Sequence, residues 1–298
     1  MMAGFLYVVA ATLLWSAVPI CVKFALRAVD AYTISWIRFA LGALILFALQ
    51  RVRRVPLRLQ RRDVGMTVVA AVGIGVNYMM YIRGLQSTTA SAGNIVVEFE
   101  VVSLVILSWI WLKERMTRGK VIGMAVTFSG VFFALWNGQN LSNLVASENF
   151  FGNMLILVAA PLWAIYAIAQ KTLMDRGVGA SSSLVYIFAL AAIITLPSVG
   201  IGFELRGPVT PTVVAALFVL VVLSTALAYI MIGKGLELLD ASTAGMITCL
   251  LPIFTIVNAR IFLGEQVTGL LAVGAGLVVA GILIIGHQET RSAPSSPP

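Results

Sequence analysis

Leu14-Trp15-Ser16, followed by Lys23, occurs again as Leu162-Trp163-Ala164, followed by Lys171, at an offset of 148 residues (162 − 14). Further matches occur at a constant offset of 151 residues (234 − 83). They are Arg83-Gly84-Leu85 with Lys234-Gly235-Leu236, Trp111-Leu112-Lys113-Glu114 with Phe262-Leu263-Gly264-Glu265, and Thr117, Gly123 and Gly130 with Thr268, Gly274 and Gly281. A constant offset along whole segments indicates that one unit was duplicated. The two halves of the chain should therefore share one fold.

The composition is that of an integral membrane protein. Of the 298 residues, 60% are hydrophobic and 11% are charged, whereas soluble domains carry about 25% charged residues. A membrane-spanning helix needs roughly 20 mostly apolar residues, and ten segments of this chain meet that requirement. They are 3–26, 31–50, 64–86, 89–112, 118–136, 150–173, 180–202, 209–235, 240–263 and 268–287.

Each copy of the repeat therefore contains five predicted helices. A five-helix unit that is followed by a second copy of itself must enter the membrane from the opposite side. Inverted repeats of this kind are typical of secondary transporters, which bind substrate near the midplane between the repeats. We expect an all-α integral membrane fold of two inverted five-helix repeats, at 1–136 and 150–287. Residues 137–149 should form an extracytoplasmic linker, and the polar, proline-rich residues 288–298 a disordered cytoplasmic tail.

The basic residues predict the orientation of the chain. Six arginines lie in loop 51–62 and four basic residues in 113–120, on the same side of the membrane, whereas 137–149 contains none. Cytoplasmic loops carry an excess of Lys and Arg, so both termini are expected in the cytoplasm of a bacterial inner-membrane protein. The net charge of +8 is thus explained by topology and contact with anionic lipid, without a nucleic-acid partner. Segment 3–26 lacks a basic n-region and should be retained as a helix.

The sequence lacks the common motifs and residue types of an enzyme active site. It contains no Gly-x4-Gly-Lys-Ser/Thr stretch, so the chain is not expected to use ATP. Its only histidine is His287, which argues against a zinc site or a histidine-based catalytic centre. Cys21 and Cys249 lie in apolar segments, so no disulfide framework is expected. We therefore expect a transporter without metal or cofactor; a lipid-modifying enzyme and a structural subunit are the alternatives.

Aromatic residues near the middle of predicted helices are candidate walls of a cavity. Trp15 and Trp163 are repeat mates that lie far from the membrane interface, where tryptophan is usually found. Packing in the bundle core is the alternative interpretation for both. The third and eighth helices add further substrate-binding candidates: Asn77, Tyr78, Tyr81 and Tyr229.

The fourth predicted helix carries two acids, Glu98 and Glu100, inside an apolar run. A charge at the bilayer centre costs roughly 2.5 kcal/mol or more, so both should face protein or water. Residues two positions apart on a helix point about 200° apart, so we expect one cavity to take only one of them. Glu98 shares a face with Ser91 and Asn94, and this polar stripe is the better candidate for substrate binding.

Arg38, in the second helix, is the natural cationic partner of these acids. Arg38 and Glu98 lie at similar depths, roughly 10 to 12 Å from the same membrane surface. One interpretation is a buried ion pair that ties the two helices together. The other is that Glu98 meets a substrate ammonium group or carries a proton, and the two are compatible if substrate competes for the pair. The repeat mate of Glu98 is Cys249, so only one repeat should handle the polar end of a substrate.

Glycines in the fifth and tenth helices permit close approach of two helices. They are Gly119, Gly123, Gly130, Gly269, Gly274, Gly276 and Gly281. Packing within one chain is the first interpretation, and a homodimer seam is the alternative.

Together these features resemble the drug/metabolite transporter superfamily, in its EamA-type ten-helix branch. The residues that carry the resemblance are Leu14-Trp15-Ser16 with Lys23, Arg38-Phe39, Leu112, Glu114, Gly123 and Gly130, and the second copies Leu162-Trp163, Leu263, Glu265, Gly274 and Gly281. The resemblance covers about residues 3–287. It implies an exporter similar to bacterial amino-acid exporters, with a cavity between the repeats.

Two features depart from the pattern of that family. Such proteins often place a proline midway along the fourth helix, as Pro252 stands in the ninth, but here the mate is Val101. Members of that family also do not generally require two acids in the fourth helix, so we expect Glu98 and Glu100 to determine which substrate is bound. We expect alternating-access export of small metabolites, most of all amino acids with aromatic or bulky neutral side chains. The alternative is proton-coupled efflux of cationic drugs through Glu98.

Overall fold

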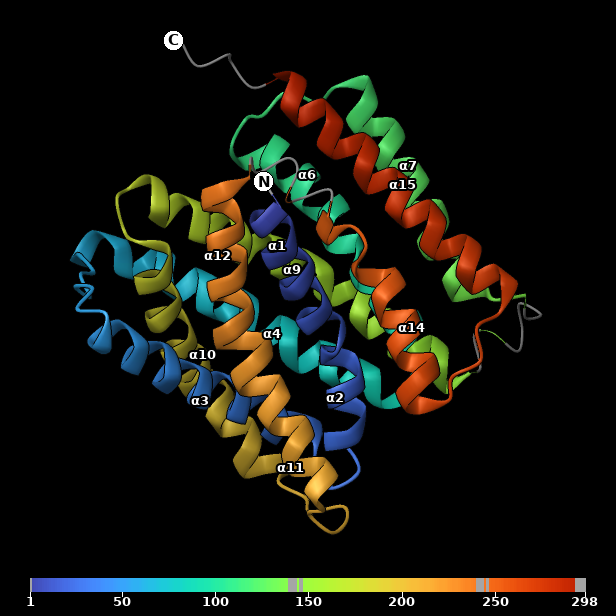
Figure 1. Ribbon diagram of the computed structural model, residues 1–298, viewed down its shortest axis with the longest axis horizontal. Coiled ribbons are helices and arrows are strands. Elements are labelled where there is room, and N and C mark those ends of the chain that lie inside the picture. Colours follow the sequence, from blue (N-terminus) through green and yellow to red (C-terminus); the bar gives the residue numbers. More distant parts are fainter. Residues whose placement is uncertain (1, 139–143, 145–146, 240–243, 245–246, 293–298) are drawn as a thin grey trace.

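The computed structural model describes residues 2–138, 144, 147–239, 244 and 247–292. The side chains of 201, 229, 233, 236, 237 and 288–292 lie outside this description. Over the described residues the chain is helical, with one isolated bridge between Val29 and Leu205 and no strand. Nine of the described helices are long and apolar enough to cross a membrane. The predicted all-α membrane fold is therefore confirmed (Figure 1).

The first half of the chain forms the five predicted spans, two of which are interrupted. Its helices are α1 (Met2–Ser16), α2 (Val18–Ala25), α3 (Ala31–Val52), α4 (Val64–Ser87), α5 (Ala90–Val97), α6 (Phe99–Trp111) and α7 (Arg118–Trp136). A short 3-10 turn, η1 (Arg61–Asp63), leads into α4. One residue separates α1 from α2, and one residue separates α5 from α6; they are Ala17 and Glu98.

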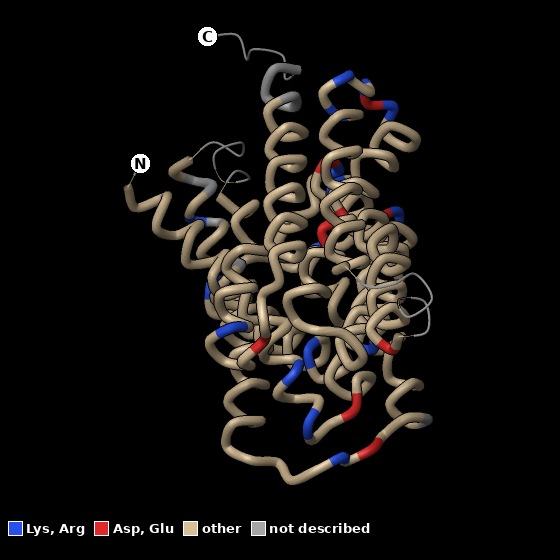
Figure 2. The backbone as a smooth tube through the Cα atoms, turned by 90° about the vertical axis from the view of Figure 1, so that its right-hand side faces the viewer, with Lys and Arg blue, Asp and Glu red and all other residues tan. Residues whose placement is uncertain are grey.

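The second half repeats this order. Its helices are α9 (Glu148–Asp175), α10 (Ala180–Gly202), α11 (Pro211–Phe218), the π-helix η2 (Val219–Leu227), α12 (Ala228–Leu238), α14 (Leu251–Leu263) and α15 (Gly269–Ser292). Most of the first part of the predicted helix 240–263 lies outside the described residues. The linker 137–149 and the tail 288–298 are also described only in part, so their boundaries stay predictions. Figure 2 shows that most of the helical tube carries no charge.

Side-chain caps explain where several helices begin. The carboxylate of Asp30 accepts hydrogen bonds from Tyr32 N and Thr33 N, both at 2.9 Å, and starts α3. Thr89 and Thr117 cap α5 and α7 in the same way. Each cap satisfies backbone N–H groups that the first turn of a helix leaves without partners. The membrane helices thus start at positions that the sequence encodes locally.

Contacts between loops show how the helices alternate in direction. Arg206 N donates to Ala28 O at 2.9 Å, so loop 203–206 lies beside loop 27–30. At the other end, Ser182 Oγ donates to Pro56 O at 3.4 Å. Each contact joins loops that are separated by an even number of spans, as alternating spans require. We call the end with loop 53–60 the arginine end and the end with loop 27–30 the opposite end.

Glycine pairs bring helices of the two halves into backbone contact. A Cβ atom on Gly130 would lie 2.6 Å from Gly274 O, and a Cβ atom on Gly123 would lie 2.7 Å from Gly281 O. These glycines hold α7 against α15, which lie side by side at the edge of the bundle (Figure 1). Packing within one chain is therefore confirmed for these four glycines. Gly276 has no atom within 4 Å of an added Cβ and lies outside this seam.

The buried apolar residues are distributed unevenly between the two ends. At the opposite end, one cluster joins α2, α5 and α11 with the nearby ends of α4, α7 and α15. Toward the arginine end, the described residues form two separate clusters. One lies among α3, α4, α9 and α10, and the smaller one contains Val8 of α1 with Ala244 and Ile247. The described part of the bundle is therefore closed most tightly at the opposite end.

Candidate functional site

A cavity of about 280 Å³ lies near the middle of the bundle, between helices of the two halves. All of the sequence-predicted substrate-binding residues except Tyr229 line it: Trp15, Asn77, Tyr78, Tyr81, Asn94, Glu98 and Trp163. The side chain of Tyr229 lies outside the described part of the chain. Arg38 and Glu100 also line the cavity. The structure thus gathers these residues in one place, and their contact with a substrate stays a prediction.

An interruption of the fourth span brings both acids to the cavity. α5 ends at Val97, and Glu98 follows it with φ −63° and ψ −10° before α6 begins at Phe99. The expectation that one cavity would take only Glu98 or only Glu100 is wrong, because both line it. That expectation assumed a continuous α-helix, in which the two side chains point about 200° apart.

The ninth span is interrupted at the mate of Glu98. Cys249 and Leu250 form a turn directly before α14, and Cys249 is 151 residues after Glu98 (249 − 98). Helices that break near the midplane, in corresponding positions of two repeats, are typical of transporter binding sites. In the second half Pro252 lies in the first turn of the new helix, whereas the fourth span breaks at Glu98 without a proline.

Asn77 of α4 forms hydrogen bonds with Glu100 of α6 and with the backbone of α9, and so connects three helices. Its Nδ2 donates to Ala159 O of α9 at 2.9 Å and to Glu100 Oε1 of α6 at 3.2 Å. An asparagine amide has two N–H donors, so both are used within the protein. The predicted contact of Asn77 with the polar head of a substrate stays a prediction; in this structure its amide nitrogen positions Glu100.

Arg38 lies against an aromatic ring. Its guanidinium carbon is 4.2 Å from the centroid of the Tyr78 ring, within the range of a cation–π interaction. The same ring meets Phe39 edge-on at a centroid distance of 5.7 Å. The predicted ion pair between Arg38 and Glu98 stays a prediction. The guanidinium is held where it lines the cavity beside the acids.

The two mid-depth tryptophans are held differently. Trp15 Nε1 donates to Ser224 O at 3.1 Å, and Ser224 Oγ donates back to Leu14 O at 2.9 Å. Ser224 belongs to the π-helix η2, a geometry often found at functional sites. Trp163 meets Tyr166 edge-on at a centroid distance of 6.2 Å. Both tryptophans line the cavity, so they do more than fill the core.

Sequence reasoning missed three aromatic residues of the cavity wall. They are Phe39, Tyr166 and Phe188. The two phenylalanines lie in apolar helices, where nothing in the sequence distinguishes a cavity wall from a lipid-facing or core position. Tyr166 follows Trp163 by one helical turn, and that spacing places both on one face. This spacing is the signal that could have identified Tyr166.

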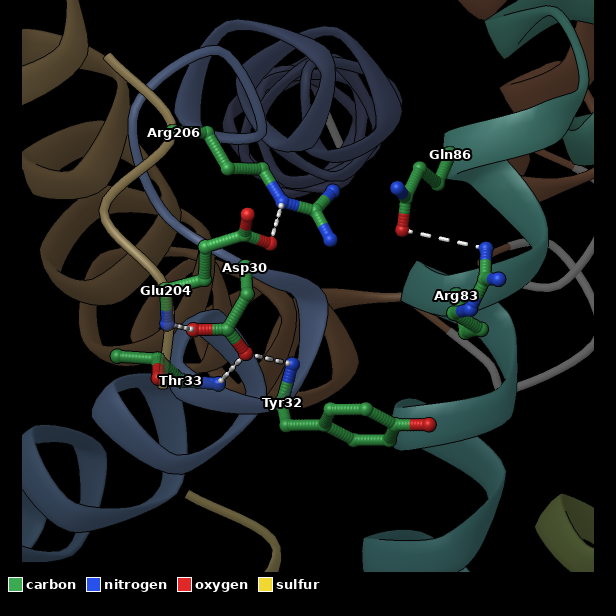
Figure 3. A network of polar contacts seen from close by, with 7 residues as sticks. All are labelled: Asp30, Tyr32, Thr33, Arg83, Gln86, Glu204 and Arg206. Atoms are coloured by element: carbon green, nitrogen blue, oxygen red, sulfur yellow. Dashed lines mark hydrogen bonds and ion pairs between the residues drawn. The ribbon is translucent and has the colours of Figure 1, made fainter. Parts of the chain in front are cut away.

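Polar side chains form a network at the opposite end of the bundle (Figure 3). Asp30 accepts a third hydrogen bond, from Glu204 N at 3.3 Å, and Arg206 pairs with the Glu204 carboxylate at 3.1 Å. Arg83 of α4 donates to Gln86 at 3.2 Å on the facing side of this network. The network ties the loop after α2 to the loop after α10. It joins the two halves at the same end as the large apolar cluster.

Comparison with known proteins agrees with this architecture. A model of the EamA-like transporter family matches residues 2–136 and again residues 150–286. An uncharacterized transporter of Archaeoglobus fulgidus is 26% identical over 93% of this chain and 95% of its own length. The uncharacterized inner membrane transporter YhbE of Escherichia coli K12 is 25% identical, over 96% and 92%. One crystal structure has a TM-score of 0.68 at 19% identity and covers 98% of this chain and 99% of its own, which shows a shared fold.

Proposed function

From the premise that the chain belongs to the EamA-like transporter family of the drug/metabolite transporter superfamily, we propose that it exports amino acids by alternating access. It is a multi-pass membrane transporter and not an enzyme. The bacterial relatives include an inner membrane transporter, which supports the same location for this chain. Both termini are proposed to lie in the cytoplasm, because the arginine end carries most of the basic residues.

One observation carries the proposal: a small mid-bundle cavity holds both signs of charge beside aromatic walls. Arg38 offers a partner for a carboxylate, and Glu98 and Glu100 offer partners for an ammonium group. An α-amino acid carries these two groups on one carbon atom. Few other small metabolites need a cation and an anion so close together in an apolar surrounding, where unpaired charges are costly.

The walls of the cavity support a preference for aromatic or bulky neutral side chains. Trp15, Phe39, Trp163, Tyr166 and Phe188 surround it. Its volume of about 280 Å³ lies near the small end of ligand pockets, which hold roughly 300 to 1,000 Å³. Aromatic rings stack well on such walls. We therefore place the substrate side chain against the rings and its polar head against the fourth span.

A second function is favoured by the presence of two acids in one cavity. A lipophilic cation could take the place of an amino acid, with protons exchanging at Glu98. Buried acids that face a transporter cavity commonly lie on substrate or proton pathways. This function would require a pH gradient to drive efflux, which separates it from facilitated amino-acid export.

The test is counterflow of each radiolabelled proteinogenic amino acid in liposomes that contain the purified protein, with and without a pH gradient. We expect counterflow of aromatic and bulky neutral amino acids, strongly reduced by Trp163→Ala. The control is Trp109→Ala, since Trp109 is 51% exposed at the end of α6 and should leave transport unchanged. Absence of counterflow for every amino acid, with pH-driven movement of a lipophilic cation, would replace the proposal with the second function.

A further inference from the structure

Two buried hydrogen-bond acceptors that line the cavity have no partner among the described residues. They are Asn94 Oδ1 and Tyr78 Oη. Buried polar atoms are almost always satisfied within a native protein, and an exception calls for a ligand or a water molecule. Asn94 is 3% exposed, so bulk solvent does not supply the missing donor. A ligand in the cavity can supply it.

Glu98 lies one helical turn after Asn94 and lines the same cavity. Positions four apart on a helix share a face. Glu98 makes no hydrogen bond or ion pair with another described residue, whereas Glu100 accepts a hydrogen bond from Asn77. The end of α5 therefore presents one available carboxylate next to one available amide oxygen.

We propose that Glu98 and Asn94 form a subsite for a primary ammonium group, with Tyr78 Oη as its third acceptor. A primary ammonium group carries three N–H donors and no acceptor, which matches three acceptors that lack donors. The carboxylate supplies the charge-assisted bond, which is the strongest of the three. The inference rests on the proposed function, and it names the substrate group that this end of the cavity recognises.

The charges that line the cavity further predict which amines it prefers. The described lining residues include two carboxyls, Glu98 and Glu100, and one guanidinium, Arg38. A zwitterionic amino acid would bring a third carboxyl group to a cavity that two carboxyls already line, opposite a single guanidinium. A solute with an ammonium group and no carboxylate would not add that third carboxyl group. The carboxamide of an amino acid should therefore bind more tightly than the amino acid itself.

The experiment compares three probes that differ at one group: phenylalanine, phenylalaninamide and N-acetylphenylalanine, with the leucine series in parallel. Counterflow of each is measured in liposomes that contain the wild-type protein. We expect phenylalaninamide to be transported at a lower KM than phenylalanine, by roughly tenfold as for one charge-assisted interaction. N-acetylphenylalanine should not be transported, because acetylation removes the ammonium group. Transport of the N-acetyl compounds at the rate of the free amino acids would overturn the subsite.

The variants assign the effect to the proposed residues. Glu98→Gln should abolish the preference for the amide, and Asn94→Ala should raise the KM of both amine probes. Glu98→Asp keeps the charge and should keep part of the preference, which separates loss of charge from misfolding. The control, Glu148→Gln, alters an exposed acid at the start of α9 and should leave all rates unchanged. A preference for the amide that survives Glu98→Gln would overturn the inference, whereas failure of all probes and all amino acids would overturn the proposed function.

Discussion

The carboxylate of Glu265 accepts hydrogen bonds from Ser91 N at 3.0 Å and from Ser91 Oγ at 2.7 Å, although the two residues are 174 positions apart. It also accepts a hydrogen bond from Ala90 N at 2.7 Å. Glu265 thus caps the N-terminus of α5, where a negative charge is favourable. The helix that carries Asn94 and Glu98 is therefore held by a loop from the other half of the chain.

The repeat mate of Glu265 makes different contacts. Glu114 pairs with Lys120 at 3.3 Å and with Lys171 at 3.5 Å. The residues that correspond to Ala90 and Ser91 in the second half lie outside the described part of the chain. The cap by Glu265 lies at the same end of the bundle as the large apolar cluster. We interpret the cap by Glu265 as part of the closure of that end.

Glu265→Gln is expected to loosen this closure. A glutamine keeps one acceptor oxygen but loses the charge, and a lost hydrogen bond to a charged group costs about 1.5 to 3 kcal/mol. Cys21 is buried in the adjacent apolar cluster, so its labelling by a hydrophilic maleimide should become faster in a Cys249→Ser background. Glu148→Gln is the control. An unchanged labelling rate in Glu265→Gln would show that the cap does not hold this end closed.

Gly130→Ala is expected to destabilise the seam between α7 and α15. The added Cβ would lie 2.6 Å from Gly274 O, and backbone must move to accommodate it. Overpacking of this kind costs typically 1 to 3 kcal/mol. Gly276→Ala is the matched control on α15, because its Cβ meets open space and alanine is favoured over glycine in a helix by about 1 kcal/mol. Thermal unfolding in detergent should separate the two variants; equal midpoints would contradict the seam.

The apolar segments of roughly 20 residues were sufficient to predict the helices, and the constant offset was sufficient to predict that the second half repeats the first. The glycines of α7 and α15, such as Gly123 and Gly281, predicted close approach of two helices, with a homodimer seam as the alternative to packing within one chain. Charge in an apolar run, as at Glu98 and Glu100, identified two acids that line the cavity. These predictions depend only on the size, polarity or charge of each residue, which the sequence gives directly.

Which face of the fourth span lines the cavity could not be predicted in the same way. Periodicity assigns a face only while a helix is continuous, and no proline marks the break at Glu98; the mate of Pro252 is Val101. The same limit applies to the π-helix that brings the Ser224 carbonyl to Trp15. The position of Phe188 in the cavity wall could not be predicted, because an apolar ring is equally stable in lipid, in the protein core and in a cavity wall.

Asp30→Ala is expected to weaken the polar network at the opposite end. Asp30 is 2% exposed, caps α3 and also accepts a hydrogen bond from Glu204 N. Loss of an N-cap costs typically about 1 kcal/mol, and the loss of the bond to the other loop should add to it. Thermal unfolding measures the effect, with Asp30→Asn expected to lie between wild type and alanine. Glu204→Gln, at an exposed carboxylate in the same network, should change the midpoint least.

Substitution of the repeat mates Trp15 and Trp163 can separate a role in stability from a role in substrate binding. Trp15→Phe keeps an aromatic wall but removes the N–H that donates to Ser224 O, so it should lower the free energy of unfolding by about 1 kcal/mol. Trp163 Nε1 makes no hydrogen bond with another described residue, so Trp163→Phe should leave stability unchanged. If the cavity binds amino acids, Trp163→Phe should act on the KM of counterflow instead. Equal loss of stability in both variants would contradict the different roles of the two indoles.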